Sequence, residues 1–305
     1  MTEQPVSPST DSNPPIVAAV DGSAVSYHAA VWGAAEAALH GRRLHLINSV
    51  NLPVGWGPGA MLTADDMEWM RKDGERILAE AERVVRAALV EPLDISLDVT
   101  NDPIIPDLIE RSRRASMVVV GSRGLGAVRR GLLGSVSTAV TRHAHGPVAV
   151  VHGWSTNDPV AAAKSILVGV DGSESSVPAL EFAFEEASRR EVGLTALHAW
   201  SDVGLGMEVP MVGWDDSIHQ SEEVALAESL AGYQERYPDV AVRRILVRDR
   251  PVDALMDESG NAQLVVVGSR GRGGFTGMLL GSTSNAVLHS VECPIVVVRH
   301  REASS

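Results

Sequence analysis

Short apolar runs alternate with longer segments of helical pattern along the first half of the chain. The apolar runs are rich in Val, Ile and Leu and are bounded by turn residues, which is typical of buried strands. They predict strands at Ile16–Val20, Leu44–Val50, Ile95–Thr100, Met117–Gly121 and Pro147–His152. The segments between them are Ala-rich or amphipathic and predict helices at Ser26–His40, Asp65–Leu89, Ile104–Arg114 and Val136–His145. A loop rich in Gly and Pro is expected at Pro53–Gly59.

The second half repeats this order of strands and helices. Strands are predicted at Ile166–Val170, Leu194–Trp200, Val242–Val247, Leu264–Gly268 and Ile295–Val298. Helices are predicted at Ser176–Arg190, Asp216–Arg236, Val252–Asn261 and Thr283–Ser290. Strands that alternate with helices imply right-handed crossovers and a parallel sheet covered on both faces. The pattern therefore predicts an α/β fold in each half, and we infer the strand order 3-2-1-4-5.

Identical strings show that the two halves arose by duplication. VVVGSRG occurs at Val118–Gly124 and again at Val265–Gly271. IVAAVDGS at Ile16–Ser23 returns as ILVGVDGS at Ile166–Ser173. A repeat of this length is a whole domain and not a solenoid unit. We expect a disordered tail over residues 1–15, domain 1 over 16–152, a linker over 153–163 and domain 2 over 164–300.

Composition and charge narrow the possible partners. The chain has 305 residues, which fits two domains of ordinary size, and its formal net charge is −13. A phosphate backbone would be repelled over most of such a surface, so we expect no nucleic-acid partner. No apolar run approaches the length of a membrane span and no signal peptide is recognised, so no membrane association is expected. Cys293 is the single cysteine, which suits a reducing cytoplasm.

The glycines after the fourth predicted strand of each half carry the strongest chemical signal. Both halves show the spacing G-x2-G-x9-G-S, with a Val-rich strand before it and a helix after it. Glycines let a backbone approach a ligand closely, and the N–H groups of the turn and of the following helix start favour anions. Two such elements suit a polyphosphate. The motif comprises Gly121, Gly124, Gly134 and Ser135 in one half, and Gly268, Gly271, Gly281 and Ser282 in the other.

Charged residues flank these glycines. Asp21 and Asp171 follow the first strand of each half, at the point where the strand order reverses and ligands bind in open sheets. Each aspartate could accept hydrogen bonds from a ribose or help to hold Mg²⁺, or it could cap the next helix through its own turn. Arg123 and Arg270 could neutralise phosphate charge or could be solvated loop residues.

Several other site classes find no support in the sequence. A Walker A pattern and the dinucleotide fingerprint G-x-G-x-x-G after the first strand are both missing. No Cys/His group has the spacing of a zinc site, and no serine has a recognisable base and orienting acid. We therefore assign no catalytic residue from the sequence.

With these motifs, both halves resemble the universal stress protein family, and G-x2-G-x9-G-[ST] is the hallmark of its ATP-binding branch. The resemblance implies a five-stranded flavodoxin-like or Rossmann-like domain in each half. It also implies ATP binding with Mg²⁺, with Asp21 and Asp171 on the ribose or metal side. By the family pattern, adenine would lie along the backbone of Ala19 with Ser49, and of Gly169 with Ala199. Ser137 and Ser284 would assist the glycine motifs.

The resemblance also bears on assembly and activity. It implies that the last strands, Val148–Val151 and Ile295–Val298, pair with each other within the chain, and that two chains form a homodimer. We expect a regulatory protein that binds one adenine nucleotide per domain and acts through its conformation or partner binding. The alternatives are a slow ATPase or autophosphorylating enzyme, an interaction module without nucleotide, and last an adenylate-forming ligase.

Overall fold

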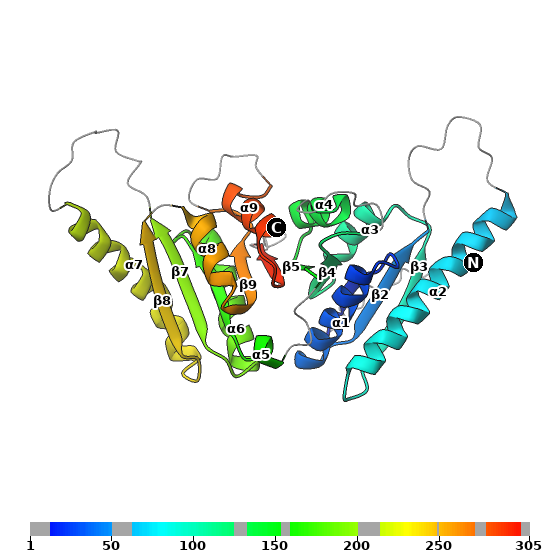
Figure 1. The fold of residues 1–305 in the computed structure, drawn as a ribbon, viewed down its shortest axis with the longest axis horizontal. Coiled ribbons are helices and arrows are strands. Elements are labelled where there is room, and N and C mark those ends of the chain that lie inside the picture. The colour runs from blue at the N-terminus through cyan, green and yellow to red at the C-terminus, as the bar shows by residue number, and fades with distance from the viewer. Residues whose placement is uncertain are drawn as a thin grey trace, which may run out of the picture.

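The structure is a computed structural model of the full chain, and the fold appears in Figure 1. Residues 13–50, 63–124, 133–153, 159–200, 214–248, 250–271 and 279–299 are described below. Most of the expected tail and the expected loop at Pro53–Gly59 lie outside these residues. Of the tail, Asn13–Pro15 are described, and the Pro15 carbonyl accepts a hydrogen bond from the Ser116 N–H at 2.9 Å.

The elements of each half follow the predicted order. The first half contains β1 (Ile16–Ala19), α1 (Ala24–Leu39), β2 (Leu44–Ser49), α2 (Ala64–Ala88), β3 (Ile95–Thr100), α3 (Ile104–Arg111), β4 (Met117–Gly121), α4 (Ser135–His143) and β5 (Val148–Val151). After the short helix α5 (Pro159–Ala162), the second half contains β6 (Ser165–Val170), the 3₁₀ turn η1 (Glu174–Ser176), α6 (Val177–Arg189), β7 (Leu194–Trp200), α7 (Trp214–Arg236), β8 (Val242–Arg248), α8 (Pro251–Ser259), β9 (Ala262–Gly268), α9 (Ser282–Ser290) and β10 (Ile295–Val298).

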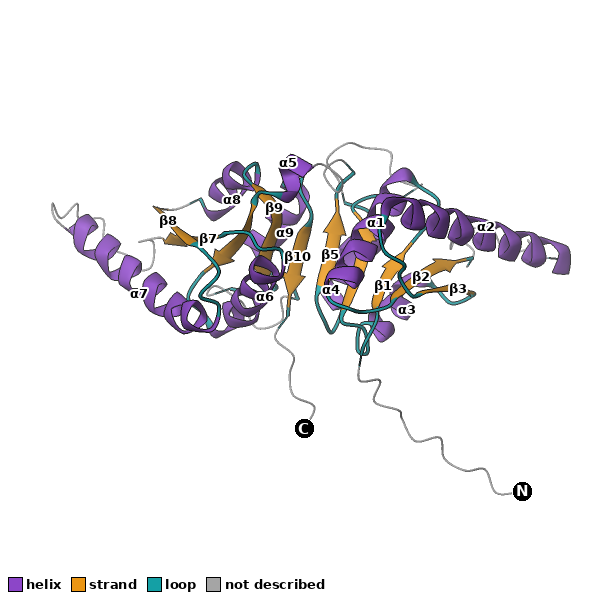
Figure 2. Ribbon diagram, turned by 90° about the horizontal axis from the view of Figure 1, so that it is seen from below, coloured by secondary structure: helices purple, strands orange, loops and turns teal. Residues whose placement is uncertain are grey.

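Ten strands form one continuous sheet in the order β3-β2-β1-β4-β5-β10-β9-β6-β7-β8. Pairing is parallel within each half, so both halves have the predicted order 3-2-1-4-5. The halves meet through β5 and β10, which pair antiparallel (Figure 2). Pairing of the last strands within the chain is thereby confirmed.

Helices cover both faces of this sheet, as a buried parallel sheet requires. One apolar core lies under α1, α2, α6 and α7 and runs through both halves. A second lies on the opposite face under α3, α4, α8 and α9. The alanines of α1 that face the sheet, among them Ala30 and Ala34, are fully buried, and their small size lets the helix approach the strands closely. No helix in the described ranges is long and apolar enough to cross a bilayer.

Some element boundaries differ from the prediction for identifiable reasons. Helix α1 begins at Ala24, two residues early, because the Ser23 side chain accepts a hydrogen bond from the Ser26 N–H and caps the helix. The expected linker contains α5, a single turn that the sequence pattern did not predict. Strand β1 ends at Ala19, one residue earlier than predicted.

Candidate functional site

The loops after the first and fourth strands of each half meet at one edge of the sheet. Strand β1 pairs with β4, so the carboxyl ends of both strands lie side by side. A Cβ atom added to Gly124 would lie 2.2 Å from Asp21 Oδ2, and one added to Gly271 would lie 2.5 Å from Asp171 Oδ2. The two loops therefore face each other, as the inferred strand order implies. Glycine at this position leaves room for the carboxylate, which would have to shift if a Cβ were present.

Each aspartate folds back on its own turn through one of its two oxygens. Asp21 Oδ1 accepts hydrogen bonds from the Ser23 N–H at 3.0 Å and from the Ser23 hydroxyl at 2.6 Å. Asp171 makes the same pair of contacts with Ser173 at 3.0 and 2.7 Å. Oδ1 of each aspartate therefore orders the turn before the next helix, as the capping alternative from the sequence expects. Oδ2 faces the glycine loop. One carboxylate both orders the helix start and presents an oxygen toward the glycine loop.

The start of the following helix is tied back to the strand that precedes it. In the first half, the Gly134 N–H donates to the Ser122 carbonyl at 2.8 Å, and the Ser137 hydroxyl donates to the Gly121 carbonyl at 2.6 Å. The second half repeats both bonds with the same lengths. They join Gly281 to the Ser269 carbonyl and Ser284 to the Gly268 carbonyl. The two motif ends are therefore held together, although the residues between them, 125–132 and 272–278, lie outside the described ranges.

The helix starts themselves offer backbone donors. Gly134 and Gly281 occupy the N-cap positions of α4 and α9, and glycine has no side chain with which to satisfy the first N–H groups. Ser135 and Ser282 follow as exposed first residues of these helices. Each helix therefore directs backbone donors and the positive end of its dipole toward the glycine loop.

A cavity of about 360 Å³ occupies this position in the second half. Its size falls within the usual range of small-molecule sites. Nine residues predicted from the sequence line it, namely Gly169, Asp171, Ala199, Gly268, Arg270, Gly271, Gly281, Ser282 and Ser284. The structure therefore brings together the complete predicted set of this half.

The cavity also has an apolar wall that the sequence analysis did not assign. Leu197, Leu255 and Val267 form part of it, and all three belong to the core on the α8–α9 side of the sheet. The strand period could have identified Leu197, because it lies two residues before Ala199 and so faces the same way. Leu255 comes from α8 and carried no such signal.

The predicted residues of the first half occupy equivalent places. Ala19 and Ser49 are the last residues of β1 and β2, as Gly169 and Ala199 lie near the ends of β6 and β7. The Ser49 hydroxyl donates to the Asp102 carbonyl at 2.8 Å, so this side chain also holds the loop before α3.

Arg123 and Arg270 influence a second pair of equivalent residues, His152 and Arg299, which directly follow the last strand of each half. Burial lowers the pKa of His152 to about 4, and the charge of Arg123 adds to this. Burial likewise lowers the pKa of Arg299 to about 10, with a contribution from Arg270. Arg299 donates to the Thr141 carbonyl at 2.6 Å, at the end of α4 in the other half. The loop cations therefore lie near the junction of the two halves.

Comparison with known proteins agrees with this architecture. The chain matches the Universal stress protein family over residues 13–152 and 162–299. It is 46% identical over 286 residues to a universal stress protein of Mycobacterium tuberculosis (strain ATCC 25618 / H37Rv), covering 93% of this chain and 96% of that protein. A universal stress protein of Mycolicibacterium smegmatis is 44% identical over 293 residues, with 94% and 97% covered. The crystal structure of a universal stress protein from Archaeoglobus fulgidus matches with a TM-score of 0.64 and 23% identity, covering 94% and 96%.

Proposed function

The chain belongs to the universal stress protein family, and from this premise we propose that each half binds one ATP molecule at the edge of the sheet described above. The observation that carries the proposal is the second-half cavity. It combines an apolar wall, a glycine loop, a helix start and one carboxylate. The purine needs the apolar wall, the triphosphate needs the glycine loop and the helix start, and the ribose needs the carboxylate.

The phosphates fit the glycine loop and the helix start. The first residues of α9, from Ser282 to Ser284, line the cavity and can supply backbone N–H donors, and Arg270 adds a positive charge. These donors matter because the chain as a whole is strongly negative, so an anion needs a local concentration of donors. In the first half the proposal assigns the same task to Gly121, Gly124, Gly134, Ser135 and Arg123.

The base fits the apolar wall, and the aspartate fits the sugar or a metal. Adenine would lie near Gly169 and Ala199, against Leu197 and Leu255. In the first half it would lie near Ala19 and Ser49. Asp171 Oδ2 and Asp21 Oδ2 face the glycine loops, where a carboxylate oxygen could accept from a ribose hydroxyl or help to hold Mg²⁺. A bound Mg²⁺ would offset the repulsion between carboxylate and triphosphate.

We further propose that binding serves regulation and not turnover. Phosphoryl transfer to a serine needs a hydroxyl that can attack. The hydroxyls of Ser137 and Ser284 are buried and donate to carbonyls, which favours a structural task. Ser135 and Ser282 remain the acceptors to examine if slow autophosphorylation occurs. ATP-dependent conformation or partner binding in the cytoplasm is the proposed output. Because the last strands already pair within the chain, a homodimer would use another surface.

The test uses glycine substitutions that crowd the carboxylate. Isothermal titration of the wild-type chain with Mg-ATP is expected to give two sites. Gly124→Ala and Gly271→Ala are each expected to weaken one site about tenfold or more, because the new Cβ displaces the aspartate. Gly232→Ala is the matched control, since nothing lies within 4 Å of the added atom.

Two outcomes would overturn the proposal. One is that the wild-type protein neither releases adenine nucleotide on heat denaturation, as read by mass spectrometry, nor binds it in titration. The other is that both loop variants bind ATP like Gly232→Ala while melting like the wild type.

A further inference from the structure

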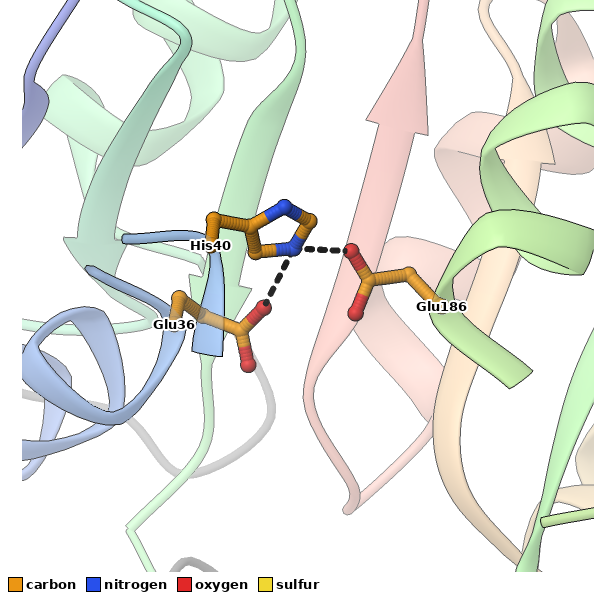
Figure 3. Close-up of side chains that lie close together, drawn as sticks. All are labelled: Glu36, His40 and Glu186. Atoms are coloured by element: carbon orange, nitrogen blue, oxygen red, sulfur yellow. Dashed lines mark hydrogen bonds and ion pairs between the residues drawn. The ribbon is translucent and has the colours of Figure 1, made fainter. Parts of the chain in front are cut away.

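A buried charged cluster joins the two halves at a distance from the proposed nucleotide sites. It consists of Glu36 and His40 at the end of α1 and of Glu186 and Arg190 at the end of α6, and we call it the interface cluster. The two glutamates are 1% and 0% exposed. Figure 3 shows the His40 ring between the two carboxylates. Glutamate is almost never buried to this degree without partners.

The cluster is built from equivalent positions of the repeat. Glu36 follows Asp21 by 15 residues, and Glu186 follows Asp171 by the same number. His40 therefore occupies the place of Arg190, and each of these residues is the C-cap of its helix. Duplication thus brings two carboxylates face to face, and each helix end supplies one basic residue to the pair. One of the two is an arginine, whereas the other is a histidine whose charge depends on pH.

Hydrogen bonding leaves one oxygen of this cluster unsatisfied. Arg190 Nε donates to Glu186 Oε2 at 3.0 Å, and a second nitrogen of Arg190 donates to Glu36 Oε1. His40 Nε2 lies 2.7 Å from Glu186 Oε1. Glu36 Oε2 is buried without a hydrogen-bond partner and lies 3.9 Å from His40 Nε2. A buried carboxylate oxygen in this state is costly unless a proton is added.

The net charge of the cluster also favours the addition of one proton. Two carboxylates and one guanidinium leave one negative charge inside the interface when His40 is neutral. Besides burial, the largest influences on the two carboxylates come from the members of the cluster themselves, and the neighbouring Gln263, which accepts from Arg190, is neutral. We propose that the interface cluster is a proton-binding site that holds α1 against α6, and that this contact weakens when the proton leaves.

The pKa shifts of the two carboxyl groups support a proton bound at Glu36. Burial raises the pKa of Glu36 to about 7 despite the opposing charge of Arg190. Burial acts on Glu186 as well, but His40 and Arg190 together hold its pKa below the ordinary value. A carboxyl whose pKa is raised by folding contributes stability that is complete below about pH 4.5 and is lost as the pH rises through about 7.

A metal ion fits the cluster less well than a proton. The ligand atoms of Glu36, His40 and Glu186 lie within 4.8 Å of one another, a spacing that a divalent ion could bridge. However, Arg190 already holds the other oxygen of both carboxylates, and two further positive charges would leave the buried cluster net positive. One proton makes it neutral.

The experiment compares variants that no longer need the proton. Glu36→Gln removes the excess negative charge with little change of shape, and His40→Arg supplies the cation that the repeat has at Arg190. Glu185→Gln breaks the exposed Glu185–Arg189 pair on α6, the helix that carries Glu186, and is the matched control. Urea unfolding is measured between pH 5 and 8 for each protein. Because other groups titrate in this range, the quantity to follow is the ratio of the wild-type unfolding constant to that of each variant.

We expect this ratio to rise by up to about tenfold per pH unit between about pH 5 and 7 for Glu36→Gln and His40→Arg, and then to level off. For Glu185→Gln it stays flat. The proposal is overturned if the ratio for Glu36→Gln is also flat, whether or not His40→Arg folds. It is equally overturned if elemental analysis of the purified wild-type chain finds one tightly held divalent metal that requires Glu36. Neither outcome bears on ATP binding, because no cluster residue lies in the proposed nucleotide sites.

Discussion

Cys293 shows how far burial changes the chemistry of a single side chain. It is 8% exposed, packs in the core under α8 and α9, and its pKa is raised to about 12, mainly by burial. Thiols react as thiolates, so at pH 8 only a very small fraction is reactive. We expect a thiol reagent such as iodoacetamide to modify the native protein at least about 100-fold more slowly than the urea-unfolded chain. Similar rates in both states would contradict this assignment.

The glycines illustrate what could be predicted for single residues. Their positions and their link to Asp21 and Asp171 followed from the repeat and from the strand order. From the sequence we expected Gly121 and Gly124 to allow a tight turn and a close backbone approach to a ligand. Among the described residues, the left-handed glycines at the site are in the Asp-Gly-Ser turns, with Gly22 at φ 89°. The pattern did not show that Gly124 leaves room for the carboxylate that faces it, because that contact depends on two loops about 100 residues apart in sequence.

At the scale of elements, the start of helix α4 is held by a hydrogen bond from a buried serine. The Ser137 hydroxyl donates to the Gly121 carbonyl and holds the helix start against the end of β4. Ser137→Ala is expected to lower the free energy of unfolding by about 1 to 2 kcal/mol without nucleotide, because the carbonyl loses a buried donor. Ser135→Ala is the comparison. Its side chain is exposed, so a change below about 0.5 kcal/mol is expected from denaturant unfolding. Equal losses in both variants would refute the structural role.

Among the helices and strands, the hydrophobic pattern predicted the buried strands well but missed one short helix. The Val-rich strands were predicted closely because strands buried on both faces form continuous apolar runs. Helix α5 was missed because four residues carry no helical period. It rests on tertiary contacts, since Gln263 donates to the Ala162 carbonyl at 2.7 Å and Lys164 donates to the Gly260 carbonyl at 2.8 Å. Such partners lie about 100 residues away and are invisible in a local window.

At the scale of the whole molecule, duplication explains what local patterns could not. The pairing of β5 with β10 followed from the family resemblance, but the interface cluster did not follow from any motif. Glu36 and Glu186 each look like ordinary charged residues of an amphipathic helix. Only alignment of the two halves places them at equivalent positions, and only the antiparallel pairing of the last strands brings those positions together. Residues that look ordinary in each repeat can therefore form an interacting cluster where the two copies meet.

His152, which directly follows β5, gives the junction a second response to pH, opposite in sign to that of the interface cluster. Its pKa is lowered by burial from the ordinary value of 6.5 to about 4. Between these values the unfolded chain binds a proton that the folded chain excludes, so stability is lost as the pH falls from about 6.5 to about 4. The loss amounts to about 3 kcal/mol. His152→Gln removes this pH-dependent contribution to the free energy of unfolding. Its free energy of unfolding relative to the wild type should therefore rise as the pH falls through that window.

The control for this prediction is His145→Gln, which replaces an exposed histidine beside the same strand and should run parallel to the wild type. Parallel curves for His152→Gln as well would show that the ring is not held neutral by the fold. The contribution of Glu36 to stability falls as the pH rises and that of His152 falls as the pH falls, so the two oppose each other between about pH 5 and 6.5. The two contributions become visible only in the separate variants, because each oppositely signed titration is masked by the other, and by the remaining groups that titrate in this range, in the wild-type profile.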